Sequence, residues 1–194
     1  MIIEKGMKKL SDHFFLAIPV PEHVAVGLQQ TADSLKPYVS YKRWTGPQDF
    51  HITLFFFGAI NDDKRLKMIQ SVREIAQQTA FFRVTLSGID GFGDKQQPRV
   101  LFASLDHSQE LTELRERIGN VLADIGFDLE ARAFHPHITI AKRWDQGAFQ
   151  HSLPKGDYTR DSQSWEVSHV ALFAVRPGQK PQYQSVADFP FQKE

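Results

Sequence analysis

The 194-residue sequence predicts an α+β or α/β protein with mixed sheets, and three observations support this fold class. Apolar runs typical of strands alternate along the chain with amphipathic helical segments. Further strand-like segments, joined by turns, follow near the C-terminal end. The tetrapeptides HITL at 51–54 and HITI at 137–140 lie 86 residues apart, each inside a predicted strand, so the two halves of the chain look related.

The first half of the chain contains two strands and two helices. Residues 13–18 form a short apolar run that Pro19 and Pro21 close, which indicates a buried strand. Helical spacing over 22–35, before Pro37, predicts a helix. Aromatic and β-branched residues over 50–57 predict a second strand that stops at Gly58. A helix is predicted over 62–79, because apolar residues share one face and carboxylates stand in the first turn.

The second half begins with strands over 82–89 and 99–105, joined by an exposed glycine-bearing loop over 90–98. Ser108 is a suitable cap for a helix that Gly126 ends. The remaining expectations are strands at 134–141, 167–175 and 183–189, an irregular stretch at 145–158 and a turn at 176–178.

Composition excludes several classes of protein. The chain has no cysteine, which excludes disulfide scaffolds, thiolate metal sites and cysteine nucleophiles. Its 23 basic and 23 acidic residues balance, so no net field draws it along nucleic acid, although a local basic site remains compatible. No apolar run reaches the length of a membrane span, and the N-terminus does not read as a secretory signal. We therefore expect a cytoplasmic protein without membrane contact.

The boundaries we expect are an N-terminal extension over 1–12 and a single domain over 13–194. Met7 is an alternative start to Met1, because the first strand pattern begins near His13.

The repeated His-x-Thr pattern points to chemistry. With apolar residues in its second and fourth positions, the pattern is expected roughly 0.05 times by chance in this composition, so chance explains two copies poorly. The alternative is two ordinary buried strands. In a strand, however, His and Thr at i and i+2 share one face. Two such pairs around one cleft supply an acid, a base and two hydroxyls, a set suited to phosphoester chemistry without a metal.

At these residues the sequence resembles the 2H phosphoesterase superfamily, named for two His-x-Thr motifs, and its RNA 2′,3′-cyclic phosphodiesterase branch, once called 2′-5′ RNA ligase. The similarity extends from His13 onward and includes the opening strand, Arg43-Trp44, the segment 88–102 and the second motif at 135–142. The resemblance implies an α+β fold of two pseudo-symmetric lobes, in which two mixed or antiparallel sheets flanked by helices enclose a central groove.

The resemblance also implies residue roles. His51 protonates the departing 3′ oxygen, His137 takes a proton from water, and Thr53 and Thr139 donate hydrogen bonds to the non-bridging phosphate oxygens. The family usually has arginine where Lys142 stands, and Arg143 follows it. Strand alternation from His137 favours Arg143 as the groove residue if the strand is regular, whereas an irregularity after residue 140 favours Lys142.

Several other residues have alternative interpretations. His135 and His137 share a strand face and, with a third ligand, would suit zinc, but we expect no metal and no cofactor. Phe14 and Phe92 are either packing residues or platforms for a base. Trp44 and Trp144 are groove-wall or core residues, and His13 is a possible groove neighbour.

These observations predict an enzyme that hydrolyses RNA 2′,3′-cyclic phosphate ends to 2′-phosphates without a metal. The alternatives are ligation of 2′-5′ ends, action on another small cyclic nucleotide, and a noncatalytic module that binds RNA ends. The expected substrates are RNA 3′ ends or small cyclic nucleotides, since the neutral chain suits short ligands. We expect a monomer.

Overall fold

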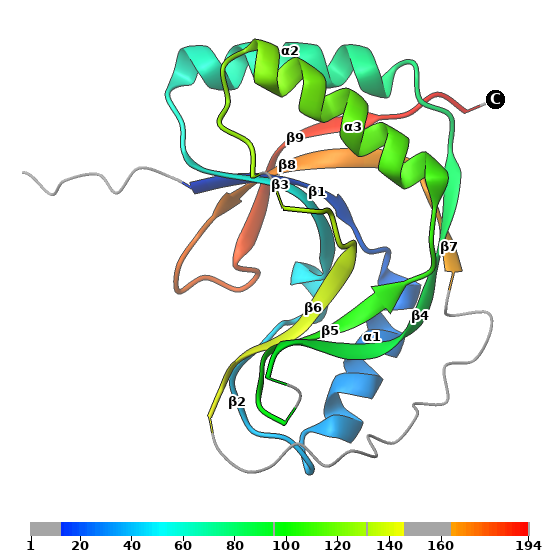
Figure 1. Ribbon diagram of the computed structural model, residues 1–194, viewed down its shortest axis with the longest axis vertical. Helices are drawn as coiled ribbons and strands as arrows, with labels where there is room; N and C mark the ends of the chain where they lie inside the picture. The colour runs from blue at the N-terminus through cyan, green and yellow to red at the C-terminus, as the bar shows by residue number, and fades with distance from the viewer. Residues whose placement is uncertain (1–12, 95, 131, 146–163, 194) are drawn as a thin grey trace, which may run out of the picture.

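The computed structural model describes residues 13–94, 96–130, 132–145 and 164–193 (Figure 1). Strands of this part of the chain form one sheet in the order β7-β4-β5-β6-β3-β1-β8-β9, and β2 pairs with β6 beside that path. Every pairing between these strands is antiparallel. The strands are β1 (His13–Pro19), β2 (Tyr41–Trp44), β3 (His51–Ala59), β4 (Phe82–Gly93), β5 (Pro98–Leu105), β6 (His137–Trp144), β7 (Ser164–Val167), β8 (His169–Val175) and β9 (Tyr183–Pro190).

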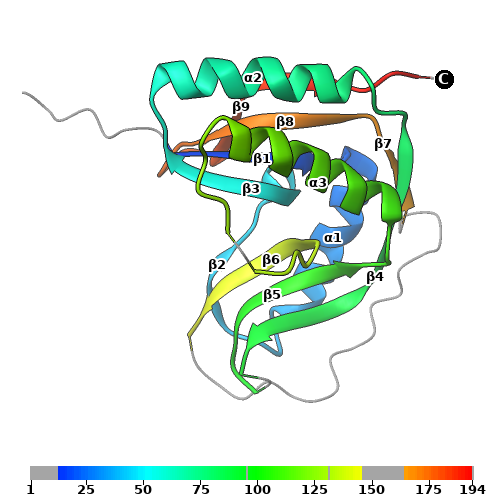
Figure 2. The same cartoon turned by 45° about the horizontal axis from the view of Figure 1, so that its top comes forward.

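Within the described ranges, three α-helices cover the sheet. These are α1 (Glu22–Leu35), α2 (Asp62–Ala76) and α3 (Gln109–Asp124), and a short 3-10 turn, η1 (Pro47–Asp49), precedes β3. Helix α1 lies by β4, β5 and β6, whereas α2 and α3 lie together over the part of the sheet formed by β1, β8 and β9 (Figures 1 and 2). Asn61 caps α2 and Ser108 caps α3 through side-chain hydrogen bonds, so the predicted Ser108 cap is confirmed.

The two halves of the sheet meet at its centre. One residue pair, Ile52 with Ile138, joins β3 to β6, and each isoleucine lies in the middle of its His-x-Thr motif. The α+β fold is therefore confirmed, and the two sheets expected from the sequence are continuous through this pair. Because the strands are antiparallel, the two motifs are related by a local twofold arrangement.

Several predicted elements differ from the structure. The loop expected over 90–98 is much shorter, because β4 extends to Gly93 and pairs with β5 along the whole hairpin. Gly91 permits this pairing, since a Cβ atom there would lie 2.5 Å from the Cβ of Pro98. The sequence analysis predicts no strand at β2. The strand predicted at 167–175 is β8, which begins at His169, and β7 precedes it with only Val167 inside the predicted range.

The other boundaries shift by a few residues. Helix α2 ends at Ala76 rather than at 79, and β6 begins at His137 rather than at 134. The expectations for residues 1–12 lie outside the described residues, as does most of the irregular stretch predicted at 145–158.

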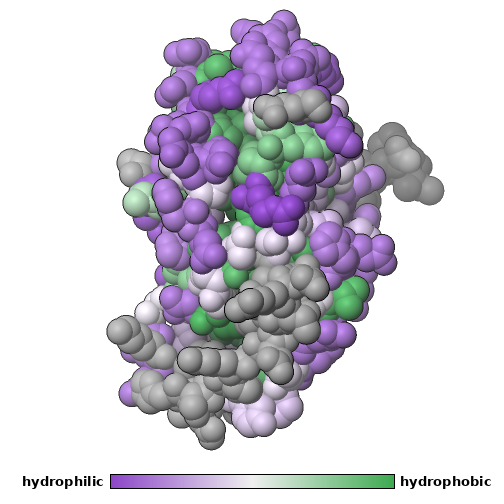
Figure 3. Space-filling model, turned by 90° about the vertical axis from the view of Figure 1, so that its right-hand side faces the viewer, coloured by the Kyte–Doolittle hydropathy of each residue, from purple (hydrophilic) through white to green (hydrophobic). Residues whose placement is uncertain are grey.

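The hydrophobic core spans both halves of the sheet. Leu16, Ile18, Ile52 and Ile138 are 0–1% exposed and lie in the central strands. The surface seen in Figure 3 is mainly hydrophilic, with a hydrophobic area between polar residues in its upper half. Burial of these core residues determines which face of each central strand points inward. The residues that alternate with them therefore lie on the opposite face.

Phe14 belongs to this core, so its predicted role as a base platform is wrong. Its side chain is 3% exposed, and the guanidinium of Arg65 lies over the ring at 5.3 Å. Alternation along β1 instead brings the next residue, Phe15, against His51.

Phe14→Ala is expected to lower the free energy of unfolding by about 3–5 kcal/mol, because a large buried ring is replaced by a cavity. Phe56→Ala is the matched control. Phe56 is 64% exposed, so its loss is expected to change the free energy by no more than about 0.5 kcal/mol. Denaturant unfolding measures both, and equal effects of the two substitutions would contradict the assignment of Phe14 to the core.

Candidate active site

Burial alternates along both motifs. In β3, His51 and Thr53 are partly exposed while Ile52 is 0% exposed. In β6, His137 and Thr139 are partly exposed while Ile138 is 0% exposed. Because Ile52 pairs with Ile138, the two histidines and two threonines lie on the same face of the joined strands. The structure brings together the four residues that the repeated motif singled out.

Both imidazoles are held in the same way. The Nδ1 atom of His51 lies 2.7 Å from the carbonyl oxygen of Asp49, and Nδ1 of His137 lies 2.8 Å from that of His135. A carbonyl oxygen only accepts, so each Nδ1 carries the proton and donates it. The Nε2 atom of each ring is therefore the lone-pair site when the ring is neutral and the proton donor when it is charged. Either histidine can act as an acid or as a base.

Aromatic rings surround His51. Phe15, Phe173 and Tyr183 have ring centroids 4.8, 6.3 and 5.1 Å from its own. This burial lowers the pKa of His51 to about 4, and the positive charge of Lys142 acts in the same direction. The imidazole is neutral at pH 7 in the unliganded protein.

His137 lies in a similar aromatic environment. Phe92 and Phe102 have ring centroids 4.8 and 5.2 Å from the imidazole, and burial lowers the pKa of His137 below its ordinary value. Phe92 also stacks on Phe102 with centroids 4.2 Å apart. Phe92 thus packs against Phe102 and His137 and remains partly exposed in the wall of a cavity.

An irregularity in β6 favours Lys142 over Arg143 as the residue that faces the groove. Leu101 and Phe102 of β5 pair with Ala141 and Thr139, so Ile140 is an extra residue in β6. The bulge reverses the alternation, and Lys142 then lines a cavity and donates from Nζ to the Tyr183 hydroxyl at 3.4 Å. Arg143 is exposed, with φ at 65°. The regular strand that would favour Arg143 is therefore not observed.

Asp49 is a site residue that the sequence analysis missed. Its carboxylate accepts hydrogen bonds from the backbone N–H groups of Gln182 and Tyr183, at 3.1 and 3.0 Å, while its carbonyl accepts from His51. Asp49 thereby holds the start of β9 through its carboxylate and orients His51 through its carbonyl group. This role is visible only in the hydrogen bonds between Asp49 and residues 182–183, which are far away in the sequence. No local sequence pattern predicts it.

Asp49→Ala is expected to lower kcat about tenfold, because two hydrogen bonds to a charged carboxylate hold Tyr183 against His51. Asp49→Asn keeps an acceptor, so its kcat should fall between those of Asp49→Ala and the original protein. The amide NMR signals of Gln182 and Tyr183 report the loss of the contacts independently of activity. Asp188→Ala is the control, because it removes a hydrogen bond from Ser185 within β9. If Asp49→Ala shifts the amide signals but leaves kcat unchanged, Asp49 is not a positioning residue.

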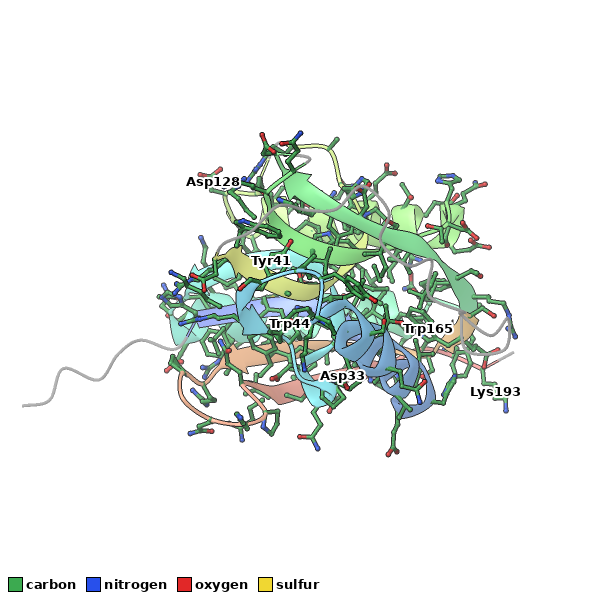
Figure 4. The ribbon with its side chains drawn as sticks, turned by 90° about the horizontal axis from the view of Figure 1, so that it is seen from below. Asp33, Tyr41, Trp44, Asp128, Trp165 and Lys193 are labelled. Carbon is green, nitrogen blue, oxygen red and sulfur yellow. The ribbon has the colours of Figure 1, made fainter. Side chains whose placement is uncertain are left out.

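Two cavities adjoin the motifs. The larger, of about 1060 Å³, is lined by Thr53 and His137 and extends to Arg115 on α3. The smaller, of about 300 Å³, is lined by Lys142, Tyr183 and Trp44 among others. Trp44 projects from β2 near Tyr41, with ring centroids 5.9 Å apart (Figure 4). Both cavities are therefore lined by aromatic and cationic groups.

The alternative zinc site at His135 and His137 needs a third ligand. Across 13–94, 96–130, 132–145 and 164–193, no group of three His, Asp or Glu side chains is arranged to hold a metal ion. The carbonyl group of His135 instead accepts the Nδ1 proton of His137.

Comparisons with known proteins identify the family of this chain. The family model of the 2′-5′ RNA ligase superfamily matches residues 20–178, which include both motifs. The chain belongs to the 2′-5′ RNA ligase superfamily. A relative from Bacillus subtilis (strain 168), named RNA 2′,3′-cyclic phosphodiesterase, is 33% identical over 188 residues, covering 94% of this chain and 98% of the relative.

Solved structures of the superfamily fold resemble this chain along almost its whole length. The Thermus thermophilus protein TT0787 has a TM-score of 0.78 with 23% identity, covering 94% of this chain and 99% of that one. Escherichia coli LigT in apo form has a TM-score of 0.75 with 19% identity, covering 93% and 98%. These similarities confirm the predicted fold family. In the part of the chain that the structure describes, no helix is long and apolar enough to cross a membrane.

Proposed function

We propose that this superfamily member is an enzyme that hydrolyses RNA 2′,3′-cyclic phosphate ends to 2′-phosphates. The observation that carries the proposal is the Ile52–Ile138 pairing, which places two Nδ1-anchored imidazoles and two threonines on one face. The name of the Bacillus subtilis relative supports the same substrate.

The proposed reaction needs one acid and one base. The Nε2 atom of His137 takes a proton from water as its oxygen bonds to phosphorus, and the bond from phosphorus to the 3′ oxygen breaks. The bound anionic phosphate stabilises the charged form of His51, and its protonated Nε2 delivers a proton to the leaving 3′ oxygen. The products are a 2′-phosphate and a free 3′-hydroxyl group.

Negative charge that develops on the phosphate oxygens in the transition state is stabilised by hydrogen-bond donors and by positive charge. Thr53 and Thr139 offer hydroxyl groups on the same face as the imidazoles, and Lys142 brings a positive charge beside His51. Such donors stabilise the transition state when they are fixed before the reaction, as backbone pairing fixes them here. We assign the phosphate contact to Lys142 rather than Arg143 because the bulge at Ile140 brings Lys142 to the site.

The test is hydrolysis of an oligoribonucleotide ending in a 2′,3′-cyclic phosphate in excess EDTA, with ³¹P NMR locating the phosphate of the product. A 2′-phosphate formed despite the chelator is the expected result. A 3′-phosphate would reverse the roles of the histidines, and activity restored only by zinc or manganese would contradict the metal-independent reaction. No turnover with oligonucleotide or small cyclic nucleotides, combined with retained binding, would point to a binding module.

The proposal extends to a monomeric enzyme in the cytoplasm, acting on short RNA ends or small cyclic nucleotides. Both motifs come from one chain, so one copy supplies the histidines and threonines. Light scattering during size-exclusion chromatography tests the monomer, and an activity that rises with dimer population would contradict it.

A further inference from the structure

Arg115 on α3 has an unusual environment in the wall of the larger cavity. Its guanidinium lies 4.8 Å from the ring centroid of Phe55 and 4.5 Å from that of Phe134. Its Nε donates to the carbonyl oxygen of Leu54 at 3.4 Å. One turn further along α3, Gly119 lies close to the Phe55 ring, where an added Cβ would meet it at 3.4 Å. The helix and the two rings therefore hold the planar group in place.

This arrangement leaves the terminal nitrogens of Arg115 for a ligand. The group is partly buried, and burial lowers its pKa from the ordinary value, but arginine remains charged in proteins. No carboxylate in the described part of the chain lies within ion-pair distance of it. A partly desolvated cation that lacks an ion-pair partner favours an anion in the cavity beside it.

The carboxylates of this cavity do not neutralise Arg115. Glu116, the next residue on α3, and Glu130, which is paired with Arg132, influence Arg115 only through the longer-range field, because neither lies within ion-pair distance of it. Asp128, seen in Figure 4, is exposed. Arg99 and Arg132 line the same cavity as well, so its three arginines outnumber its two carboxylates and the cavity carries excess positive charge.

The larger cavity is too large for a cyclic phosphate alone. Its volume of about 1060 Å³ lies just above the range for small-molecule sites, about 300–1,000 Å³, and its lining includes Thr53, His137 and Arg115. The smaller cavity is about 300 Å³ and is lined by Lys142. If the cyclic phosphate lies at the histidines, the larger cavity has room for the chain that leads to it.

We propose that Arg115 binds the phosphodiester immediately upstream of the cyclic phosphate, so that the protein selects RNA ends over nucleoside 2′,3′-cyclic phosphates. The inference rests on the proposed function, because it assumes that the reacting phosphate lies between His51 and His137. The planar guanidinium offers two parallel N–H donors to two phosphate oxygens, a geometry that lysine lacks. Arg115 is then a specificity residue and takes no part in proton transfer.

The experiment compares cytidine 2′,3′-cyclic phosphate with a dinucleotide that ends in the same cyclic nucleotide and has one upstream phosphodiester. In the original protein we expect kcat/KM to be higher for the dinucleotide. Arg115→Gln should reduce that preference about tenfold while the value for the mononucleotide stays within about twofold. Arg115→Lys should lose part of the preference. Arg117→Gln, on the same helix but outside the cavity lining, should leave both values unchanged.

A change in the substrate tests the same contact without relying on the folding of a variant. A neutral methylphosphonate at the upstream linkage should lower kcat/KM of the original protein about tenfold and should have little effect on Arg115→Gln. Equal hydrolysis of charged and neutral dinucleotides by the original protein would overturn the inference. Arg115→Gln that loses activity equally on both natural substrates would also overturn it. If the original protein hydrolyses neither substrate, the proposed function fails instead.

Discussion

Replacing His51 or His137 by alanine is expected to lower kcat on an RNA 2′,3′-cyclic phosphate by at least about 100-fold, because each change removes one of the two proton-transfer groups. The double variant should be little slower than the worse single variant, since acid and base act as a unit. Single-turnover kinetics with a labelled oligonucleotide measures the chemical step directly.

His23→Ala is the matched control, because His23 is exposed on α1 and lies outside both cavities. Its kcat should equal that of the original protein. Binding of the oligonucleotide should change little in the His51 and His137 variants, which separates loss of catalysis from loss of fold. A single variant that keeps near-normal turnover would remove that histidine from the proposed reaction.

The sequence predicts much of the fold because local patterns determine many of its elements. Helix α1 has the predicted bounds, and α3 follows the Ser108 cap and stops before Gly126, which has φ at 88°. The bulge at Ile140 and the extension of β4 to Gly93 escape prediction, because both depend on pairing with β5. A strand's partner determines its bulges and its end, and the partner lies far away in the sequence.

Some residues of the candidate site are likewise predicted by local sequence patterns, whereas others depend on long-range contacts. The repeated His-x-Thr motifs predict which side chains share a face, since alternation is a local property of a strand. The contacts of Asp49 and Arg115 join residues up to 134 positions apart. The sequence pattern contains no signal for such contacts, because a lone Asp or Arg on a helix or turn is ordinarily a solvated side chain.

The electrostatic environment of the two histidines sets the expected pH dependence. Burial among aromatic rings lowers the pKa of His51 to about 4 and lowers that of His137 below its ordinary value. Above the higher of these two pKa values neither imidazole carries a proton, so no acid is available. Below the lower one both are protonated, so no base is available. This holds whichever histidine acts as the acid.

The profile of kcat/KM, which reports the free enzyme, is therefore expected to be bell-shaped with its maximum below about pH 6.5, the ordinary pKa of histidine. The anionic substrate stabilises the charged imidazoles, so the maximum of kcat should lie at higher pH. Imidazole NMR titration measures both pKa values independently of activity. Lys142→Met should raise the pKa of His51, because it removes a nearby positive charge, whereas Arg143→Met should not. Titration of both histidines at or above about pH 6.5, with a kcat/KM maximum above neutrality, would contradict the desolvated site.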